Sequence, residues 1–167
     1  MKSQAGSIVI DTCLIYGNDC SLGSGGGVMA ESIGSGKSVQ LSHCTVTGNT
    51  TRYNAGGFHV KNGDNGTCVM LNNILSGNTA GSNAPKKPDL TLENAFATGT
   101  AYNLFGPSDE AVGSNYAVGS APFVGSGDYR LSEAKELGFE TDDPMCVDLD
   151  YNGRRGFLDV GCYEFGG

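Results

Sequence analysis

The residues best placed to do chemistry recur at equivalent positions of a repeated unit. Glu31, Lys61 and Glu93 share one such position, so stacking the units would place the lysine between two carboxylates. His59 precedes Lys61 by two residues, and in a strand that spacing puts both side chains on one surface. This surface could process an acidic polysaccharide, with Lys61 neutralising a uronate and His59 acting as base. The alternative is a solvated charge ladder that contributes about 0.2–1 kcal/mol per pair.

A neighbouring loop offers a second pair of contact residues, Arg52 and Tyr53. Tyr53 could stack on a sugar ring, and Arg52 could bond the sugar hydroxyls or a carboxylate. An ordinary exposed loop tip is the alternative interpretation.

A third candidate is a calcium loop in "DLDYNGRRGFLD", residues 148–159. Asp148, Asp150, Asn152 and Asp159 occupy positions one, three, five and twelve of an EF-hand-type loop. Position twelve is normally a glutamate, however, and no helical pattern flanks the segment. Calcium therefore remains one alternative, and no other cofactor is indicated.

The six cysteines, at positions 13, 20, 44, 68, 146 and 162, form no C-x-x-C pair and no cluster with histidine. Their main predicted role is that of small apolar residues in a core. No motif for a nucleophilic triad or a phosphate-binding loop accompanies them.

These residues are positioned by a repeat of about thirty residues. The pairs Gly17-Asn18, Gly48-Asn49 and Gly77-Asn78 are 31 and 29 residues apart. Aligning them also aligns short apolar patches with period-2 alternation, separated by Gly, Asn and Ser. The shared columns are Ile8/Val39/Cys68, Ile10/Leu41/Met70, Ile15/Val46/Leu75, Val28/Phe58/Leu90, Ala30/Val60/Leu92 and, facing outward, Met29/His59/Thr91.

Short strands without helices, repeated at this period, predict an all-β fold: a right-handed parallel β-helix of about three to five coils. Glycine allows the corner conformations because it tolerates positive φ. Asn18, Asn49 and Asn78 are predicted to form a ladder in which each amide bonds the next.

Two groups of motifs resemble known families. "IYGN…GGGVMA" and "VTGN…AGGFHV" resemble the Gly-Asn/Gly-Gly units of right-handed β-helix surface proteins, including polymorphic outer-membrane proteins and bacterial adhesins. "NLFG" (103–106), "SAPFVGSGDYRLSEA" (120–134) and "VDLDYNGRRGFLDVGCYEF" (147–165) resemble the end of the choice-of-anchor Q group. "SEAKELGFETDDP" replaces that group's Ser-Pro-Ala-Ile-Asp-like stretch, and Cys162 replaces an expected alanine. The resemblance implies a secreted or surface-anchored bacterial protein associated with glycans or adhesion. It does not imply an enzyme, because the shared motif lies at the end of the solenoid and not in a catalytic site.

The expected organisation is one structural domain, with β-helix coils over residues 1–126 and a closing coil and cap over residues 127–167. A short helical turn is expected at "SEAKELG" (132–138). Cys146 and Cys162 flank the closing segment and could form a disulfide. A core strand begins almost at once, at Ile8, so we expect further coils and a signal peptide upstream of this chain.

The net charge of −8 and the lack of a basic patch argue against nucleic-acid binding. No apolar run is long enough to span a membrane. The leading hypothesis is therefore an extracellular, monomeric and non-catalytic module that presents Glu31, Arg52, Tyr53, His59, Lys61 and Glu93 to a polysaccharide or cell-surface glycan. A polysaccharide lyase or glycoside hydrolase acting from the same face, and a fragment similar to a phage tail spike, are the alternatives.

Overall fold

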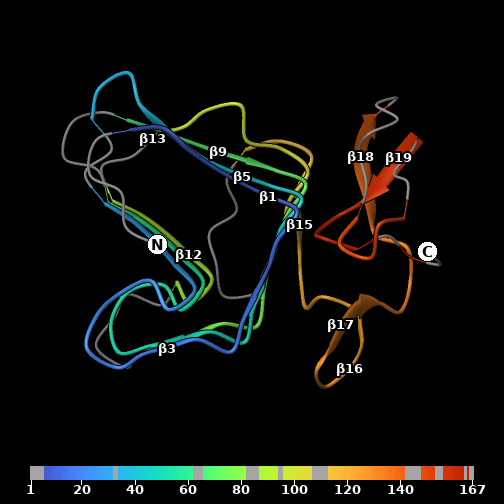
Figure 1. The fold of residues 1–167 in the computed structure, drawn as a ribbon, viewed down its shortest axis with the longest axis horizontal. Helices are drawn as coiled ribbons and strands as arrows, with labels where there is room; N and C mark the ends of the chain where they lie inside the picture. Colours follow the sequence, from blue (N-terminus) through green and yellow to red (C-terminus); the bar gives the residue numbers. More distant parts are fainter. Residues whose placement is uncertain are drawn as a thin grey trace.

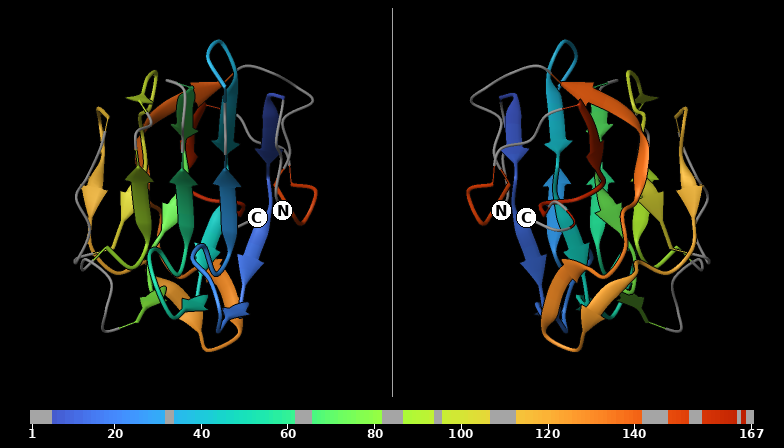
Figure 2. Two further views of the ribbon diagram at one scale, coloured as in Figure 1. Left: turned by 90° about the vertical axis from the view of Figure 1, so that its left-hand side faces the viewer. Right: turned by 90° about the vertical axis from the view of Figure 1, so that its right-hand side faces the viewer.

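The chain folds into stacked parallel strands. The computed structural model describes residues 6–31, 34–61, 66–81, 87–93, 96–106, 113–141, 148–152, 156–163 and 165, and no helix occurs among them. Strands from successive units overlie one another in Figure 1 and run side by side in Figure 2. The predicted all-β class with parallel pairing is thereby confirmed.

Four parallel sheets gather equivalent strands of the units. Sheet A contains β1 (Ile8–Asp11), β5 (Ser38–Ser42), β9 (Thr67–Leu71) and β13 (Phe96–Ala97). Sheet B contains β2 (Leu14–Tyr16), β6 (Thr45–Thr47), β10 (Ile74–Leu75), β14 (Leu104–Phe105) and β15 (Ala117–Val118). Sheet C contains β3 (Asp19–Cys20), β7 (Thr50–Thr51) and β11 (Thr79–Ala80). Sheet D contains β4 (Val28–Glu31), β8 (Phe58–Lys61) and β12 (Leu90–Glu93).

The predicted columns are confirmed residue by residue, because each predicted set pairs directly across adjacent strands. In sheet A, for example, Ile8 pairs with Val39, which pairs with Cys68. The other confirmed sets are Ile10/Leu41/Met70, Ile15/Val46/Leu75, Val28/Phe58/Leu90, Ala30/Val60/Leu92 and Met29/His59/Thr91.

The inward side chains of these columns form the main core. Its fully buried members include Val39, Leu41, Val46, Phe58, Val60, Met70, Leu75 and Phe105. No single unit could bury such a face alone, so the stacking of the units supplies most of the stability.

The predicted asparagine ladder is also confirmed. Asn18 Nδ2 donates to Asn49 Oδ1 at 2.8 Å, and Asn49 Nδ2 donates to Asn78 Oδ1 at 2.9 Å. The ladder ends on a residue that the sequence did not indicate, since Asn78 Nδ2 donates to Asp89 Oδ1 at 2.6 Å. A carboxylate suits this last position because, when ionised, it can only accept hydrogen bonds.

The C-terminal segment packs against the outer face of sheet B, to the right of it in Figure 1. It contains two antiparallel pairs, β16 (Phe123–Gly125) with β17 (Asp128–Leu131), and β18 (Glu136–Thr141) with β19 (Gly156–Asp159). Outward-facing Ile74 and Leu104 of sheet B form a second apolar cluster with Leu131 and Val160. The segment predicted as a cap on the last coil therefore covers the flank of a sheet.

The helical turn predicted at residues 132–138 is wrong. The backbone from Glu136 onward belongs to strand β18, which pairs with β19 from Asp159 back to Gly156. Pairing with a strand distant in sequence has outweighed the local helix preference of Glu, Ala, Lys and Leu.

Candidate functional site

The candidate site is the outer face of sheet D, formed by Met29, Glu31, His59, Lys61, Thr91 and Glu93. These side chains face outward because alternate residues of the same strands enter the core. The register places Glu31 opposite Lys61 and Lys61 opposite Glu93, as the repeat predicted.

The two carboxylates of this column make different contacts. Lys61 Nζ lies 4.0 Å from Glu31 Oε1, and both side chains are partly exposed, so this ion pair contributes little to stability. Glu93 turns instead toward His59, with its Oε1 3.3 Å from His59 Nε2. Lys61 is therefore between the two carboxylates in register but is paired with only one of them among the described residues.

His59 is enclosed, with 3% of its surface exposed. Its contact with Glu93 has a geometry too poor for a hydrogen bond, and neither ring nitrogen is hydrogen-bonded to a described residue. Burial lowers the pKa of His59, outweighing the attraction of Glu93, so the ring is neutral at pH 7. Both nitrogens are buried, which leaves the predicted general base without access to a substrate.

The lowered pKa of His59 predicts a loss of stability in mild acid. The unfolded chain binds a proton near the ordinary histidine pKa of about 6.5, whereas the folded chain, despite Glu93 and Glu31 nearby, resists protonation there. The contribution of neutral His59 to the free energy of unfolding is therefore fully present above that pH, and it declines as the pH falls toward the lowered pKa. Between pH 7.5 and 5.5, we expect the melting temperature of the natural chain to fall at least about 2 °C more than that of His59→Gln. Equal falls in the two proteins would contradict this assignment.

The loop that carries Arg52 and Tyr53 lies beside the outer face. The Arg52 guanidinium carbon is 5.7 Å from the centre of the Tyr53 ring, and Tyr53 is 41% exposed. The next residue, Asn54, joins this loop to the face because its Nδ2 donates to Glu93 Oε1 at 2.9 Å. The sequence contains no signal for Asn54, since the contact crosses 39 residues and depends on how the loop turns.

The calcium ligands predicted from the sequence do not converge. The Asp148 carboxylate accepts hydrogen bonds from the backbone nitrogens of Asp150, at 2.9 Å, and Asn152, at 2.7 Å. The Asp159 carboxylate accepts from the backbone nitrogens of Lys135 and Phe165. Within the described ranges, no three His, Cys, Asp or Glu side chains are grouped to hold a metal ion. The residues present thus fit turn-stabilising roles better than a calcium loop, and calcium binding stays an untested prediction.

The buried cysteines have the predicted core role. Cys44 and Cys68 are fully enclosed in the main core. Burial raises the pKa of the Cys44 thiol well above its usual range and that of Cys68 to about 12, so neither provides a reactive thiolate at neutral pH. Cys162 is buried, whereas Cys146 lies outside the described residues, so the predicted disulfide remains a prediction.

No protein-family model, no curated protein and no solved structure matches the chain.

Proposed function

We propose that this chain is a right-handed parallel β-helix module of a secreted or surface-anchored bacterial protein, and that it binds glycans without cleaving them. The β-helix interpretation is supported by parallel pairing between units about thirty residues apart. The right-handed sense is supported by the rule that nearly all crossovers between parallel strands are right-handed. The resemblance to the choice-of-anchor Q group supports the location. No helix in the described ranges is long and apolar enough to cross a membrane.

We infer binding without cleavage from which groups of the candidate site are enclosed and which are accessible to a ligand. His59, which a base-catalysed reaction would need, is enclosed. The accessible groups are the Lys61 ammonium, with a side chain 53% exposed, and the Arg52–Tyr53 pair. A cation beside an exposed aromatic ring is suited to holding a sugar ring and an acidic substituent, and needs no proton transfer.

The test is binding of the whole chain to a panel of acidic and neutral polysaccharides, measured by titration calorimetry. We expect Tyr53→Ala to weaken binding about 10-fold and Lys61→Ala to weaken binding of acidic glycans by about 5-fold. Tyr151→Ala is the matched control, because Tyr151 is a tyrosine that is 86% exposed on the C-terminal segment. Binding that is unaffected by Tyr53→Ala, or absent for every polysaccharide, would overturn the proposal.

The same incubations separate the alternatives. New chain ends that disappear with Lys61→Ala would identify a polysaccharide lyase or glycoside hydrolase and replace the proposed function. A trimer in analytical ultracentrifugation would favour the module similar to a phage tail spike.

A further inference from the structure

The first unit of the stack has an open edge. Its strands β1, β2 and β3 each lie at the end of a parallel sheet, so each is paired on one side only. The backbone amides of Leu14 and Asp19 donate to no described residue. The equivalent amides of the second unit, Thr45 and Thr50, donate to carbonyls of the first unit at 2.9 and 2.8 Å. An unpaired edge of this kind is a template for the addition of a further strand.

The apolar columns of sheets A and B are open at the same end. Leu41 and Val46 of the second unit are fully buried. Ile10 and Ile15 occupy the same two columns in the first unit, and they are only partly buried. In sheet D the first unit is already covered, since Val28 is 5% exposed. An apolar neighbour on the open side would therefore bury further surface in sheets A and B.

The asparagine ladder is open at this end too. Asn18 Nδ2 donates to the Tyr16 carbonyl at 3.2 Å, just as Asn49 Nδ2 donates to the Thr47 carbonyl at 3.1 Å, so the two amides have the same orientation. Asn49 Oδ1 accepts from the backbone and side-chain nitrogens of Asn18, whereas Asn18 Oδ1 accepts from no described residue. A segment that completes the ladder has to offer N–H donors at this position, as a further asparagine would.

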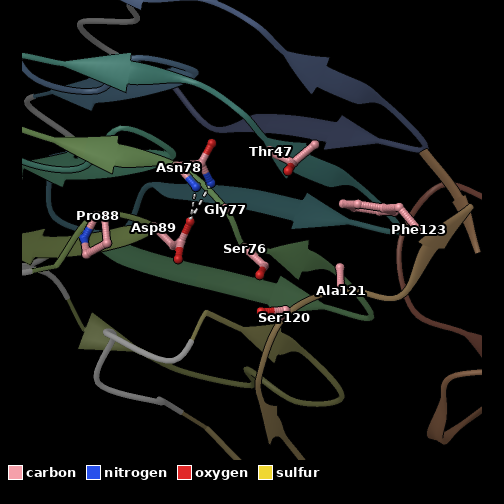
Figure 3. A pocket seen from close by; sticks show the side chains of 9 residues that line it. All are labelled: Thr47, Ser76, Gly77, Asn78, Pro88, Asp89, Ser120, Ala121 and Phe123. Atoms are coloured by element: carbon pink, nitrogen blue, oxygen red, sulfur yellow. Dashed lines mark hydrogen bonds between the residues drawn. The ribbon is translucent and has the colours of Figure 1, made fainter. Parts of the chain in front are cut away.

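A second copy of this chain does not complete the ladder. At its other end the ladder finishes at Asp89, whose carboxylate accepts from the side chain of Asn78 (Figure 3). Head-to-tail stacking would bring this carboxylate to Asn18 Oδ1, and an ionised carboxylate has only acceptor oxygens. Two copies joined through their first units would bring two Asn18 oxygens together, which are also both acceptors.

We propose that the open edge of the first unit binds a segment of another polypeptide, which adds to the stack as one more parallel unit. The geometry defines the chemistry of this segment. Branched apolar residues at alternate positions cover Ile10 and Ile15, and an asparagine amide donates to Asn18 Oδ1. Backbone carbonyls of the segment accept from the amides of Leu14 and Asp19. The interface lies at the end of the stack and does not depend on glycan binding by the outer face of sheet D.

The test is an NMR titration of the isotopically labelled full chain with an unlabelled peptide that copies residues 38–61, which contain β5 to β8 of the second unit. We expect saturable shifts at the amides of Leu14, Asn18 and Asp19, with a Kd of about 0.1–1 mM because the peptide must become ordered on binding. Hydrogen exchange at Leu14 and Asp19 should slow at least about 10-fold at saturation. No saturable shift at these amides with about 3 mM peptide would overturn the proposal.

Asn49→Asp in the peptide tests the ladder, because it keeps the shape and replaces the donor to Asn18 Oδ1 with an acceptor. We expect this peptide to bind about 10-fold more weakly. Arg52→Gln in the peptide is the matched control and should leave binding unchanged, because Arg52 is exposed in a loop outside the ladder and the apolar columns. Equal binding of the Asn49→Asp and unchanged peptides would contradict the proposal. Shifts of the same amides when the chain alone is concentrated would also overturn it, since a second copy would then be the occupant.

Discussion

Gly56→Ala is expected to lower the free energy of unfolding by about 3–5 kcal/mol, although alanine is the smallest possible side chain. An added Cβ would lie 2.6 Å from the backbone nitrogen of Thr79 and 2.7 Å from the carbonyl oxygen of Asn49, and closer still to the Thr79 carbonyl. Asn49 and Thr79 lie in two neighbouring units, and the Thr79 backbone nitrogen donates to the Asn49 carbonyl oxygen at 2.8 Å. Making room for the added Cβ would therefore require breaking a hydrogen bond between the units. Urea denaturation of the natural and variant chains measures the difference.

Gly34→Ala is the matched control, because no atom of the described residues lies within 4 Å of its added Cβ and its φ is not positive. Its stability should differ from that of the natural chain by less than about 0.5 kcal/mol. Similar losses in both variants would mean that close packing is not the cause of the loss at Gly56, because alanine at an uncrowded site should stabilise the protein slightly by reducing the conformational entropy of the unfolded chain.

This contrast refines the role that the sequence suggested for glycine. Gly17, Gly48 and Gly77 have positive φ, so the prediction of glycine-dependent corners holds for the Gly-Asn pairs. Gly56 and Gly57 do not, and they are glycine because backbone from the neighbouring unit passes where a side chain would lie. Sequence alone cannot separate these two causes, since both place glycine at the same repeated position in each unit.

The register could be predicted because every repeated column has the same requirement. A position that faces the core must be apolar in each unit, so Val28, Phe58 and Leu90 reveal their stacking by their types and spacing. Contacts on the outer face carry no such requirement. The turn of Glu93 toward His59 and Asn54 depends on side-chain rotamers and on one loop, neither of which repeats.

The C-terminal segment was harder to predict for a similar reason. Its packing depends on outward-facing Ile74 and Leu104, which in a strand pattern of two residues cannot be distinguished from inward-facing ones. Both faces of these short strands are apolar and buried. A search for alternating apolar and polar residues finds strands with only one buried face, so it does not detect strands of this kind. An apolar residue on each face of a two-residue strand would have been the available signal.

The second large effect is expected at Asn49, the central member of the asparagine ladder. Asn49 is fully buried; its Oδ1 accepts from both nitrogens of Asn18, and its Nδ2 donates to Asn78 and to the carbonyl of Ile15. Asn49→Ala removes these side-chain bonds from a buried site, and we expect a loss of about 3–4 kcal/mol in urea denaturation. Asn78 Oδ1 would keep only its bond from the backbone nitrogen of residue 49, at 3.0 Å, and Asn18 Nδ2 only its bond to the Tyr16 carbonyl, at 3.2 Å. Asn18→Ala is the control, because Asn18 is exposed at the end of the ladder, and about 1 kcal/mol or less is expected there.

Asn49→Asp distinguishes hydrogen bonding from simple filling of space, because it keeps the shape and replaces the donor with an acceptor. The new carboxylate would face Asn78 Oδ1 and the Ile15 carbonyl, which are also acceptors. Burial would raise its folded-state pKa above the ordinary value of about 3.9, so stability should be lowest near neutral pH and recover in part as the pH falls toward 4. Asn49→Ala has no group there to titrate and should show no such recovery relative to the natural chain. If Asn49→Asp is as stable as the natural chain at pH 7, the amide ladder does not direct the stacking, and the apolar columns alone hold the units in register.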